Sequence, residues 1–320
     1  MMSMKRNVNE KRKKRKVVRD RFTSTAVAAI PLMGWLLFGV IPLALALVVG
    51  FTELHSTDLT EMKFIGLKNF KTILTNGDGH TYLSYLGTFI FILSVPLTIG
   101  LALYIADKVN RTKIGKKFFR AIFFIPFVCS MVVVSMTFRL LFKPDGVVNA
   151  IFQKLGFMPQ GWLADSPVSF LAVAIVLSIW SGIGWCIVLF QAALAGVDSS
   201  YYEAAKLDGA TPRQMFWQIT WPAISPTTSY LFTMKLIGAL QVMTETYVLS
   251  SNLKYVALWP GTTVQAGDTV VRHIYNMIFE SSYLYGYGLA AAAGWILAIV
   301  VFIFTQVNLK LQDRWVNYDF

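Results

Sequence analysis

The chain has 320 residues and a formal net charge of +12, and it is 55% hydrophobic and only 14% charged. A soluble domain has roughly 45–50% apolar and about 25% charged residues, so this chain cannot cover a water-exposed surface with polar groups. The composition therefore excludes a soluble globular protein and predicts an integral membrane protein. The two cysteines, Cys129 and Cys186, both lie in apolar segments, which argues against a disulfide framework or a cysteine-based metal site.

A basic arm over residues 1–25 precedes the first apolar block. Its Lys5–Arg21 segment holds ten Lys and Arg residues and no aromatic side chain. This pattern favours contact with anionic lipid headgroups over binding to nucleic acid. The block that follows, Ala26–Phe51, is too long for a secretory signal and has no small-residue cleavage site, so we expect a retained first helix.

Six membrane-spanning helices are predicted in the domain of residues 26–320, because apolar blocks of about twenty residues match the roughly 30 Å hydrocarbon core of a bilayer. Barrel strands would be only about ten residues long and would alternate apolar with polar. Arg139 and Lys235 are the only charged residues within the blocks. The predicted fold class is an all-α polytopic membrane protein. The expected spans are Ala26–Phe51, Ser84–Ile105, Ala121–Leu141, Val168–Leu194, Ser225–Thr244 and Leu284–Asn308.

The segments between these spans differ in basic charge. Twenty Lys and Arg residues fall on one side of the membrane and seven on the other. The positive-inside rule then places both termini, and the loop between the fourth and fifth spans, in the cytoplasm. Thr52–Leu83 and Glu245–Tyr283 are expected to face outward.

The cytoplasmic segment Asp198–Pro222 carries start and stop signals for a first short helix. Ser200 followed by Glu203 has the spacing of a capping box, in which the hydroxyl and the carboxylate each bond a backbone N–H of the first turn. Gly209 predicts a left-handed residue that ends this helix.

A second helix start follows directly. Thr211 is the expected cap, Pro212 occupies the first helical position, and Gln214 lies three residues after the cap. We expect Pro222 and Pro226 to end this second helix. The segment should thus form a compact two-helix knob in the cytoplasm.

The knob also resembles the EAA signature of the permeases of binding-protein-dependent importers. Glu203-Ala204-Ala205 is followed after three residues by Gly209, and after nine more by Ile219 and then Pro222. Trp221 stands where that family usually has leucine. By this resemblance the knob is a coupling helix that inserts into an ATPase subunit. The residues implied in that contact are Glu203, Ala204, Ala205, Asp208 and Gly209.

Further segments resemble the sugar-transporting branch of that family, the maltose and glycerol-3-phosphate type. They are Phe64–Phe70, Phe119–Pro126, Gly146–Asn149, Trp162-Leu163 and Trp315–Tyr318. Ser250–Gly261 departs from the branch, because the usual Thr-Gly-Gly-Pro run is missing.

The resemblance implies a permease of a bacterial inner membrane that pairs with a second permease. Two separate ATPase subunits would bind ATP and magnesium, and an extracytoplasmic solute-binding protein would deliver a sugar or oligosaccharide. It implies no cofactor in this chain and no covalent chemistry.

Candidate residues for the substrate path combine aromatic faces, which cover the apolar side of a sugar ring, with polar groups for its hydroxyls. They are Trp180, Trp185, Lys235, Gln241, Glu245 and Tyr275. Trp180 and Trp185 are five residues apart and so point to different helix faces, and we expect at most one of them to line a cavity. Glu245 would lie nearly three turns from Lys235 on one helix, which excludes direct pairing there. Lys235 fits a cavity residue and a contact with the partner permease equally well.

The sequence lacks the motifs of an ATPase and of a zinc enzyme. Gly115-Lys116 is not part of a phosphate-binding loop, and His55, His80 and His273 have no helical i, i+4 partner for zinc. We therefore expect no metal site and no enzyme. Two alternatives remain open at this point: an ion-coupled secondary transporter, which would show internal repeats with broken helices, and a membrane-embedded lipid-modifying enzyme.

Overall fold

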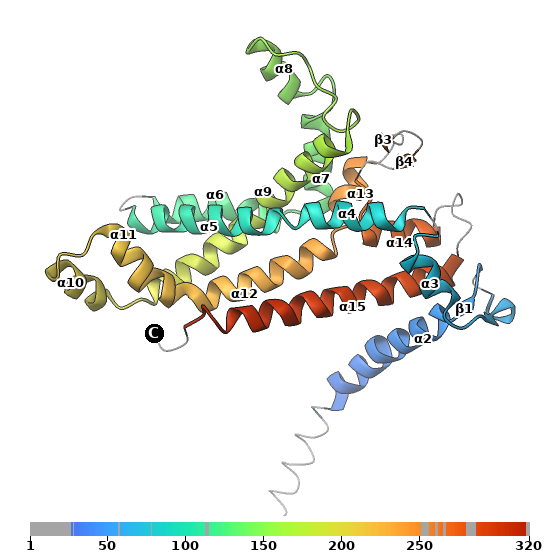
Figure 1. Ribbon diagram of the computed structural model, residues 1–320. Coiled ribbons are helices and arrows are strands. Elements are labelled where there is room, and N and C mark those ends of the chain that lie inside the picture. The colour runs from blue at the N-terminus through green and yellow to red at the C-terminus, as the bar shows by residue number, and fades with distance from the viewer. Residues whose placement is uncertain are drawn as a thin grey trace, which may run out of the picture.

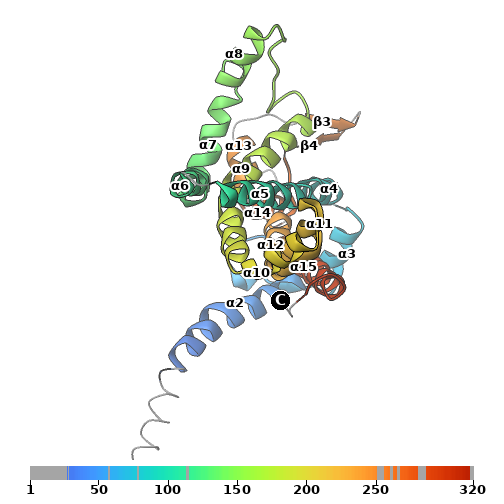
Figure 2. The same cartoon turned by 90° about the vertical axis from the view of Figure 1, so that its left-hand side faces the viewer.

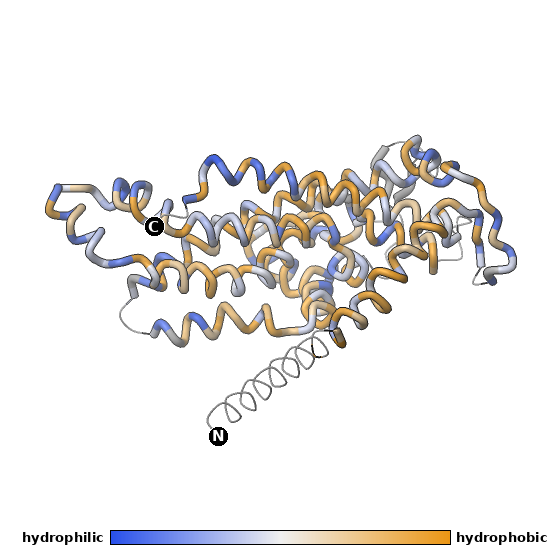
Figure 3. The backbone as a smooth tube through the Cα atoms, turned by 90° about the horizontal axis from the view of Figure 1, so that it is seen from below, coloured by the Kyte–Doolittle hydropathy of each residue, from blue (hydrophilic) through white to orange (hydrophobic). Residues whose placement is uncertain are grey.

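Long helices that lie side by side dominate the computed structural model (Figure 1). The structure describes residues 27, 29–56, 58–77, 79–112, 115–250, 256–259, 262–264, 267–279 and 286–317. The predicted basic arm lies outside the described residues. Hydrophilic residues gather at the two ends of the long helices, and hydrophobic residues dominate their middle parts (Figure 3). This distribution is typical of helices whose central parts lie in hydrocarbon.

Four helices in the described part of the chain are long and apolar enough to cross a membrane. They correspond to the first, second, fourth and sixth predicted spans, with shifted limits. Their bounds are Ala29–Gly50, Thr81–Asn110, Val168–Ala195 and Gly286–Gln312. The elements that make up these helices are η1 (Leu36–Val40), α2 (Ile41–Gly50), α4 (Thr81–Phe91), α5 (Ser94–Arg111), α9 (Pro167–Ala195) and α15 (Gly286–Gln312).

The third predicted span, Ala121–Leu141, is wrong as a single helix. α6 (Lys116–Val128) and α7 (Met131–Leu141) meet at an angle of 97°. Cys129 and Ser130 between them have extended backbone, with ψ of 146° and 130°, so the ladder of i→i−4 hydrogen bonds stops there. The bent pair counts as at most one further candidate span.

α12 (Trp221–Leu240) occupies the place of the fifth predicted span and has 20 residues. Because it carries several Ser and Thr residues as well as Lys235, it is less apolar than the four candidate spans. It ends at Leu240, before the predicted limit of Thr244. The chain then turns into a separate short helix, α13 (Thr244–Ser250).

Two π turns, η1 and η3 (Phe216–Thr220), each end two residues before a proline, Pro42 and Pro222. A proline inside an α-helix has no N–H and clashes with the carbonyl four residues earlier, and a wider turn relieves that clash. The prediction that Pro222 and Pro226 end the second helix of the knob is therefore wrong. α11 (Pro212–Met215), η3 and α12 follow one another without a break, and Pro226 lies inside α12.

α9 lies at the centre of the molecule, with α5, α6 and α12 packed against it (Figures 1 and 2). Its side chains Phe170, Leu177, Ile187 and Phe190 are completely buried. α6 approaches α9 closely at Gly184, where a Cβ atom would lie 2.0 Å from the Phe123 carbonyl oxygen. A small residue at such a point permits the close backbone approach typical of membrane helices.

The first helix contacts α15 through α2 and otherwise diverges from the bundle (Figure 2). None of the most apolar part of Ala29–Gly50 is buried within this chain. Lipid or another subunit must cover these side chains, because a surface this apolar is unfavourable in water.

Short elements complete the end of the molecule opposite the knob. Asn69 is buried in α3, and its side-chain amide donates to the carbonyls of Gly50 and Thr52 at 3.1 and 2.8 Å. The Phe64–Phe70 motif thereby closes the end of the first helix that lies away from the knob. The elements are the antiparallel pair β1 (Thr52–Glu53) and β2 (Lys63–Phe64), η2 (Leu59–Glu61), α3 (Lys68–Leu74), the antiparallel pair β3 (Val256–Trp259) and β4 (Thr262–Val264), and α14 (Val270–Phe279).

α8 (Val147–Lys154) projects away from the bundle (Figure 1). α8 and the chain that follows it to Leu163 form a hairpin, which the buried Asn149 holds together. Its amide group donates to the carbonyls of Pro144 and Gln160 at 3.0 and 2.8 Å, and its oxygen accepts from the Trp162 indole at 3.0 Å. The Gly146–Asn149 and Trp162-Leu163 motifs are thus two halves of one hairpin.

Candidate functional site

The knob is formed by α10 (Ser199–Leu207) and α11, and it extends beyond one end of the bundle (Figure 1). The predicted capping box of Ser200 and Glu203 does not form, because α10 starts earlier. Asp198 is the cap, and its carboxylate accepts from the Ser200 N–H at 2.9 Å. The hydrogen bonds from the backbone and side chain of Ser200 lower the pKa of Asp198. Glu203 therefore has no capping role and is exposed.

The predicted stop of the first knob helix is confirmed. Gly209 has a φ of 74°, in the left-handed region that disfavours residues with a Cβ. The Gly209 N–H donates to the Lys206 carbonyl at 3.1 Å, and the Ala210 N–H donates to the Ala205 carbonyl at 2.9 Å. This pair of bonds is the Schellman arrangement of a helix end. A Cβ at Gly209 would meet nothing within 4 Å, so the requirement for glycine is conformational.

The predicted start of the second knob helix is also confirmed. The Gln214 N–H donates to the Thr211 hydroxyl at 3.4 Å, and the Thr211 N–H donates to the Gln214 side-chain oxygen at 2.8 Å. Pro212 occupies the first helical position, as expected. Reciprocal bonds of this kind satisfy two backbone donors that the helix itself cannot.

The knob exposes both charged and apolar side chains. Leu207 is 90% exposed and Tyr201 is more than half exposed, as is Trp217 in η3, just after the knob. Of the five residues implied in ATPase contact, Ala205 is half-buried and the others are exposed: Glu203, Ala204, Asp208 and Gly209. Large exposed apolar side chains at a protruding tip are typical of a protein–protein contact.

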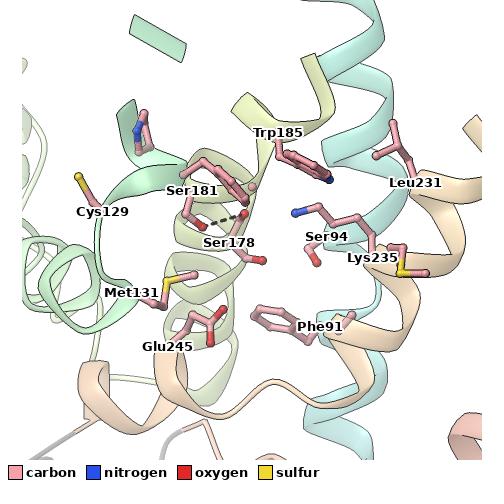
Figure 4. A pocket seen from close by; sticks show the side chains of 16 residues that line it. Phe91, Ser94, Cys129, Met131, Ser178, Ser181, Trp185, Leu231, Lys235 and Glu245 are labelled. Carbon is pink, nitrogen blue, oxygen red and sulfur yellow. Dashed lines mark hydrogen bonds between the residues drawn. The ribbon is translucent and has the colours of Figure 1, made fainter. Parts of the chain in front are cut away.

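A cavity of about 380 Å³ lies inside the bundle between α4, α5, α6, α7, α9, α12 and α13 (Figure 4). Its volume falls in the range of roughly 300–1,000 Å³ found for small-molecule sites. Phe127 and Trp185 stack on one wall, with ring centroids 5.3 Å apart. The polar residues that line it are Ser94, Ser178, Ser181, Lys235 and Glu245.

Half of the predicted path residues reach this cavity, namely Trp185, Lys235 and Glu245. The other half lie elsewhere. Trp180 lines an apolar groove with Leu101 and Ile122, Tyr275 packs between Tyr247 and Phe279, and Gln241 is exposed in the break after α12. The expectation that Trp180 and Trp185 face different sides is confirmed.

Lys235 and Glu245 are not on one helix. The sequence-based argument against their direct pairing assumed a single helix, so it does not apply. α12 ends between them, and α13 returns Glu245 to the cavity that Lys235 enters from the opposite wall (Figure 4). Gly182 makes room for the lysine, because a Cβ there would lie 2.0 Å from the Lys235 Nζ. The cavity thus contains one lysine and one glutamate side chain.

Ser94, Ser178 and Ser181 were missed as cavity residues. A signal for two of them was present, since Ser178, Ser181, Gly182 and Trp185 recur at helical spacing and form one stripe of α9. Ser94 has no such pattern around it in α5. Small hydroxyl residues in apolar spans also bond their own helix, as Ser181 does to the Ser178 carbonyl at 3.2 Å, so they give a weak signal alone.

Among the described residues, no group of three or more His, Cys, Asp or Glu side chains is arranged to hold a metal ion. Two of the histidines lie beside single carboxylates. His55 is 3.5 Å from Glu53 at the surface, and His273 is 3.8 Å from Asp268 in the interior.

Membrane-length helices around an internal cavity that both apolar and polar side chains line, with an exposed two-helix knob at one end, are typical of a multi-pass membrane transport protein. Residues 94–317 match the model of the family described as the inner membrane component of binding-protein-dependent transport systems. The chain belongs to this family and is a permease component of an ABC transporter, not an enzyme. Family membership rules out the secondary transporter and the lipid-modifying enzyme.

Relatives of known sequence cover nearly the whole chain. A probable ABC transporter permease protein, YesP of Bacillus subtilis, is 32% identical over 96% of this chain and 96% of its own length. The arabinooligosaccharides transport system permease protein AraP of the same organism is 30% identical over 88% of this chain and 85% of its own.

A solved bacterial ABC transporter involved in the import of the acidic polysaccharide alginate has the same fold. Its chain is 24% identical, with a TM-score of 0.78 over 93% of this chain and 98% of that one.

Proposed function

We propose that this permease carries a sugar or oligosaccharide, which an extracytoplasmic solute-binding protein delivers and which the internal cavity accepts. The main support for this proposal is the set of side chains that line the cavity. The stacked Phe127 and Trp185 rings offer an aromatic face to the apolar side of a sugar ring, and three serine hydroxyls, Lys235 and Glu245 offer partners for its hydroxyls. The arabinooligosaccharide permease among the relatives supports the same class of cargo.

In this proposal, two partner ATPase subunits bind ATP and magnesium, and ATP hydrolysis there drives transport. A second permease forms the other half of the path. The protruding knob supports such a contact, because its tip combines an almost fully exposed Leu207 with the charges of Glu203 and Asp208. We propose that Glu203, Ala204, Ala205, Asp208 and Gly209 touch the ATPase. Closure of the ATPase pair would then move the knobs and re-expose the cavity by alternating access.

In the proposed topology, the domain of residues 26–320 crosses the inner membrane six times, with the basic arm 1–25 and both termini in the cytoplasm. α12 is the least apolar span. Four of its five Ser and Thr hydroxyls are bonded within the protein and its Lys235 enters the cavity, so these polar groups need not face lipid. The bent pair of α6 and α7 counts as one span.

The test is uptake of labelled oligosaccharides by the complete transporter in proteoliposomes, with a matched pair of variants on α9. Trp185→Ala removes a cavity wall, and we expect it to weaken oligosaccharide uptake about tenfold or more, as truncation of a packed aromatic contact does. Trp180→Ala removes the same side chain from the groove outside the cavity and should keep near-normal uptake. Equal effects of the two variants, with the ATPase still bound, would contradict a sugar site in the cavity.

A further inference from the structure

A group of buried polar side chains joins α12 to α15 near the knob. The amides of Asn308 and Gln312 both donate to the Thr233 hydroxyl at 2.9 Å, and that hydroxyl donates to the Ser229 carbonyl at 2.9 Å. The Ser229 hydroxyl in turn donates to the side-chain oxygen of Gln312. All four residues are less than 10% exposed.

The Thr233 hydroxyl is saturated by these bonds, since a hydroxyl has one hydrogen to donate and two lone pairs to accept with. Buried amides that lose such partners retain the full cost of their desolvation. Sliding or separating α12 and α15 would therefore break several bonds at once with no water to replace them. We call Ser229, Thr233, Asn308 and Gln312 the α12–α15 clamp.

Contacts continue from the clamp toward the knob. The chain after α15 returns to α12, where the Asn317 N–H donates to the Ser225 hydroxyl at 2.9 Å. Trp315 stacks on Trp221 with ring centroids 6.0 Å apart and an interplanar angle of 22°. The closing motif of the sequence is thus fastened to the cytoplasmic start of α12.

The first knob helix is fastened to the same base. The Tyr202 hydroxyl of α10 bonds the Thr220 hydroxyl of η3 at 2.8 Å. The second knob helix continues through η3 into α12 without a break. The knob, α12 and the cytoplasmic end of α15 are therefore linked by helix continuity, ring stacking and buried hydrogen bonds.

We propose that the α12–α15 clamp makes α15 move with the knob as one body, so that Thr233, Asn308 and Gln312 are positioning residues for coupling. This inference rests on the proposed role of the knob as the ATPase contact. α12 carries Lys235 into the cavity two residues after Thr233. Movement of the clamped pair would thus change the cavity wall and the α15 side of the bundle together.

The test compares Thr233→Val with Thr233→Ser in the complete reconstituted transporter. Valine keeps the shape but leaves both amides without their acceptor, and we expect solute transported per ATP hydrolysed to fall about tenfold. Serine keeps the hydroxyl and should restore the ratio. A merely structural role would alter the yield of assembled complex, not this ratio. Thr305→Val is the control, because the Thr305 hydroxyl donates to the Val301 carbonyl of its own helix.

Gln312→Leu gives a second test from the α15 side, with exposed Gln306→Leu as its control. Spin labels at exposed Tyr230 on α12 and Leu309 on α15 report their separation during ATP turnover. We expect a constant separation in the wild-type complex and a nucleotide-dependent spread in Gln312→Leu. A separation that changes in the wild type, or an unchanged ratio in both Thr233→Val and Gln312→Leu, would overturn the clamp.

Failure of the clamp and failure of the coupling knob give different results. If Glu203→Ala uncouples transport while the clamp variants behave as their controls, the proposed ATPase contact of the knob is supported and the proposed role of the clamp is wrong. If Glu203→Ala also transports normally, the proposed ATPase contact is wrong and the clamp loses its role with it.

Discussion

Two carboxylates of the knob, five residues apart, have different roles. Asp198 holds the first turn of α10, whereas Glu203 is exposed and free of that task. Because hydrogen bonds lower the pKa of Asp198, its cap is fully formed above the ordinary pKa of about 3.9. Its stabilising effect is lost only as the pH falls through the lower folded-state pKa. The knob should thus keep its shape across the physiological pH range.

If Glu203 contacts the ATPase as proposed, Glu203→Ala should lower transport about tenfold or more, because its loss would leave a partner charge in that contact unmatched. The melting temperature of the purified permease should stay unchanged, since the carboxylate is exposed and caps no helix. Glu203→Gln removes the charge but keeps the size, and should fall between. Asp198→Ala should instead speed amide hydrogen exchange at the start of α10. If Glu203→Ala lowered the melting temperature while the ATPase still bound normally, Glu203 would have a local structural role and not a coupling role.

At the scale of elements, two glycines of α9 leave equally little room for a side chain but have different neighbours. A Cβ at Gly184 would meet the backbone carbonyl of Phe123 in α6, and a Cβ at Gly182 would meet the flexible end of Lys235. Backbone cannot move without shifting a whole helix, whereas a lysine end can adopt another rotamer. The close approach of α6 to α9 at Phe123 therefore requires that residue 184 has no side chain.

Gly184→Ala should therefore destabilise the permease by ~1–3 kcal/mol, the usual cost of overpacking, and lower its melting temperature in detergent. Gly182→Ala should leave the melting temperature near the wild-type value and change solute uptake, because Lys235 is pushed from its place in the cavity. Thermal unfolding and uptake assays on the two variants check this pair. A larger drop in melting temperature for Gly182→Ala than for Gly184→Ala would contradict the packing of α6 on α9.

For the whole molecule, we predict the orientation in the membrane from the distribution of charge. The segments predicted on the knob side, counted together with the basic arm, hold twenty of the Lys and Arg residues, so the positive-inside rule predicts that this side faces the cytoplasm. The elements around β1, β2 and α3, at the opposite end of the bundle, would then face outward (Figure 1). Both termini would share the side of the knob.

Single cysteines at Ser200 and Thr60, in a chain with Cys129→Ser and Cys186→Ala, test this orientation. A membrane-impermeant thiol reagent applied to intact cells should label the exposed Thr60→Cys and spare Ser200→Cys until the cells are permeabilised. Labelling of Ser200→Cys alone in intact cells would reverse the topology and place the knob out of reach of any cytoplasmic ATPase.

Features that depend on a few neighbouring residues could be predicted from the sequence. The membrane class, four of the six span positions, the stop at Gly209 and the capping box of Thr211 and Gln214 rest on local composition, backbone preference and hydrogen bonds within one turn. The importer-permease family was also evident, because its signature lies in one continuous segment. Where two local signals competed, as at Asp198 and Ser200, the sequence did not decide which would cap.

Only the tertiary structure decided what meets across the bundle. The bend between α6 and α7, the return of Glu245 to face Lys235, and the gathering of three serines around one cavity are not local features. The cavity joins residues as far apart in the chain as Ser94 and Glu245, which are 151 positions apart. The α12–α15 clamp likewise pairs residues 75 to 83 positions apart. Such contacts depend on how whole helices pack and where they break, and no spacing within a single segment encodes that geometry.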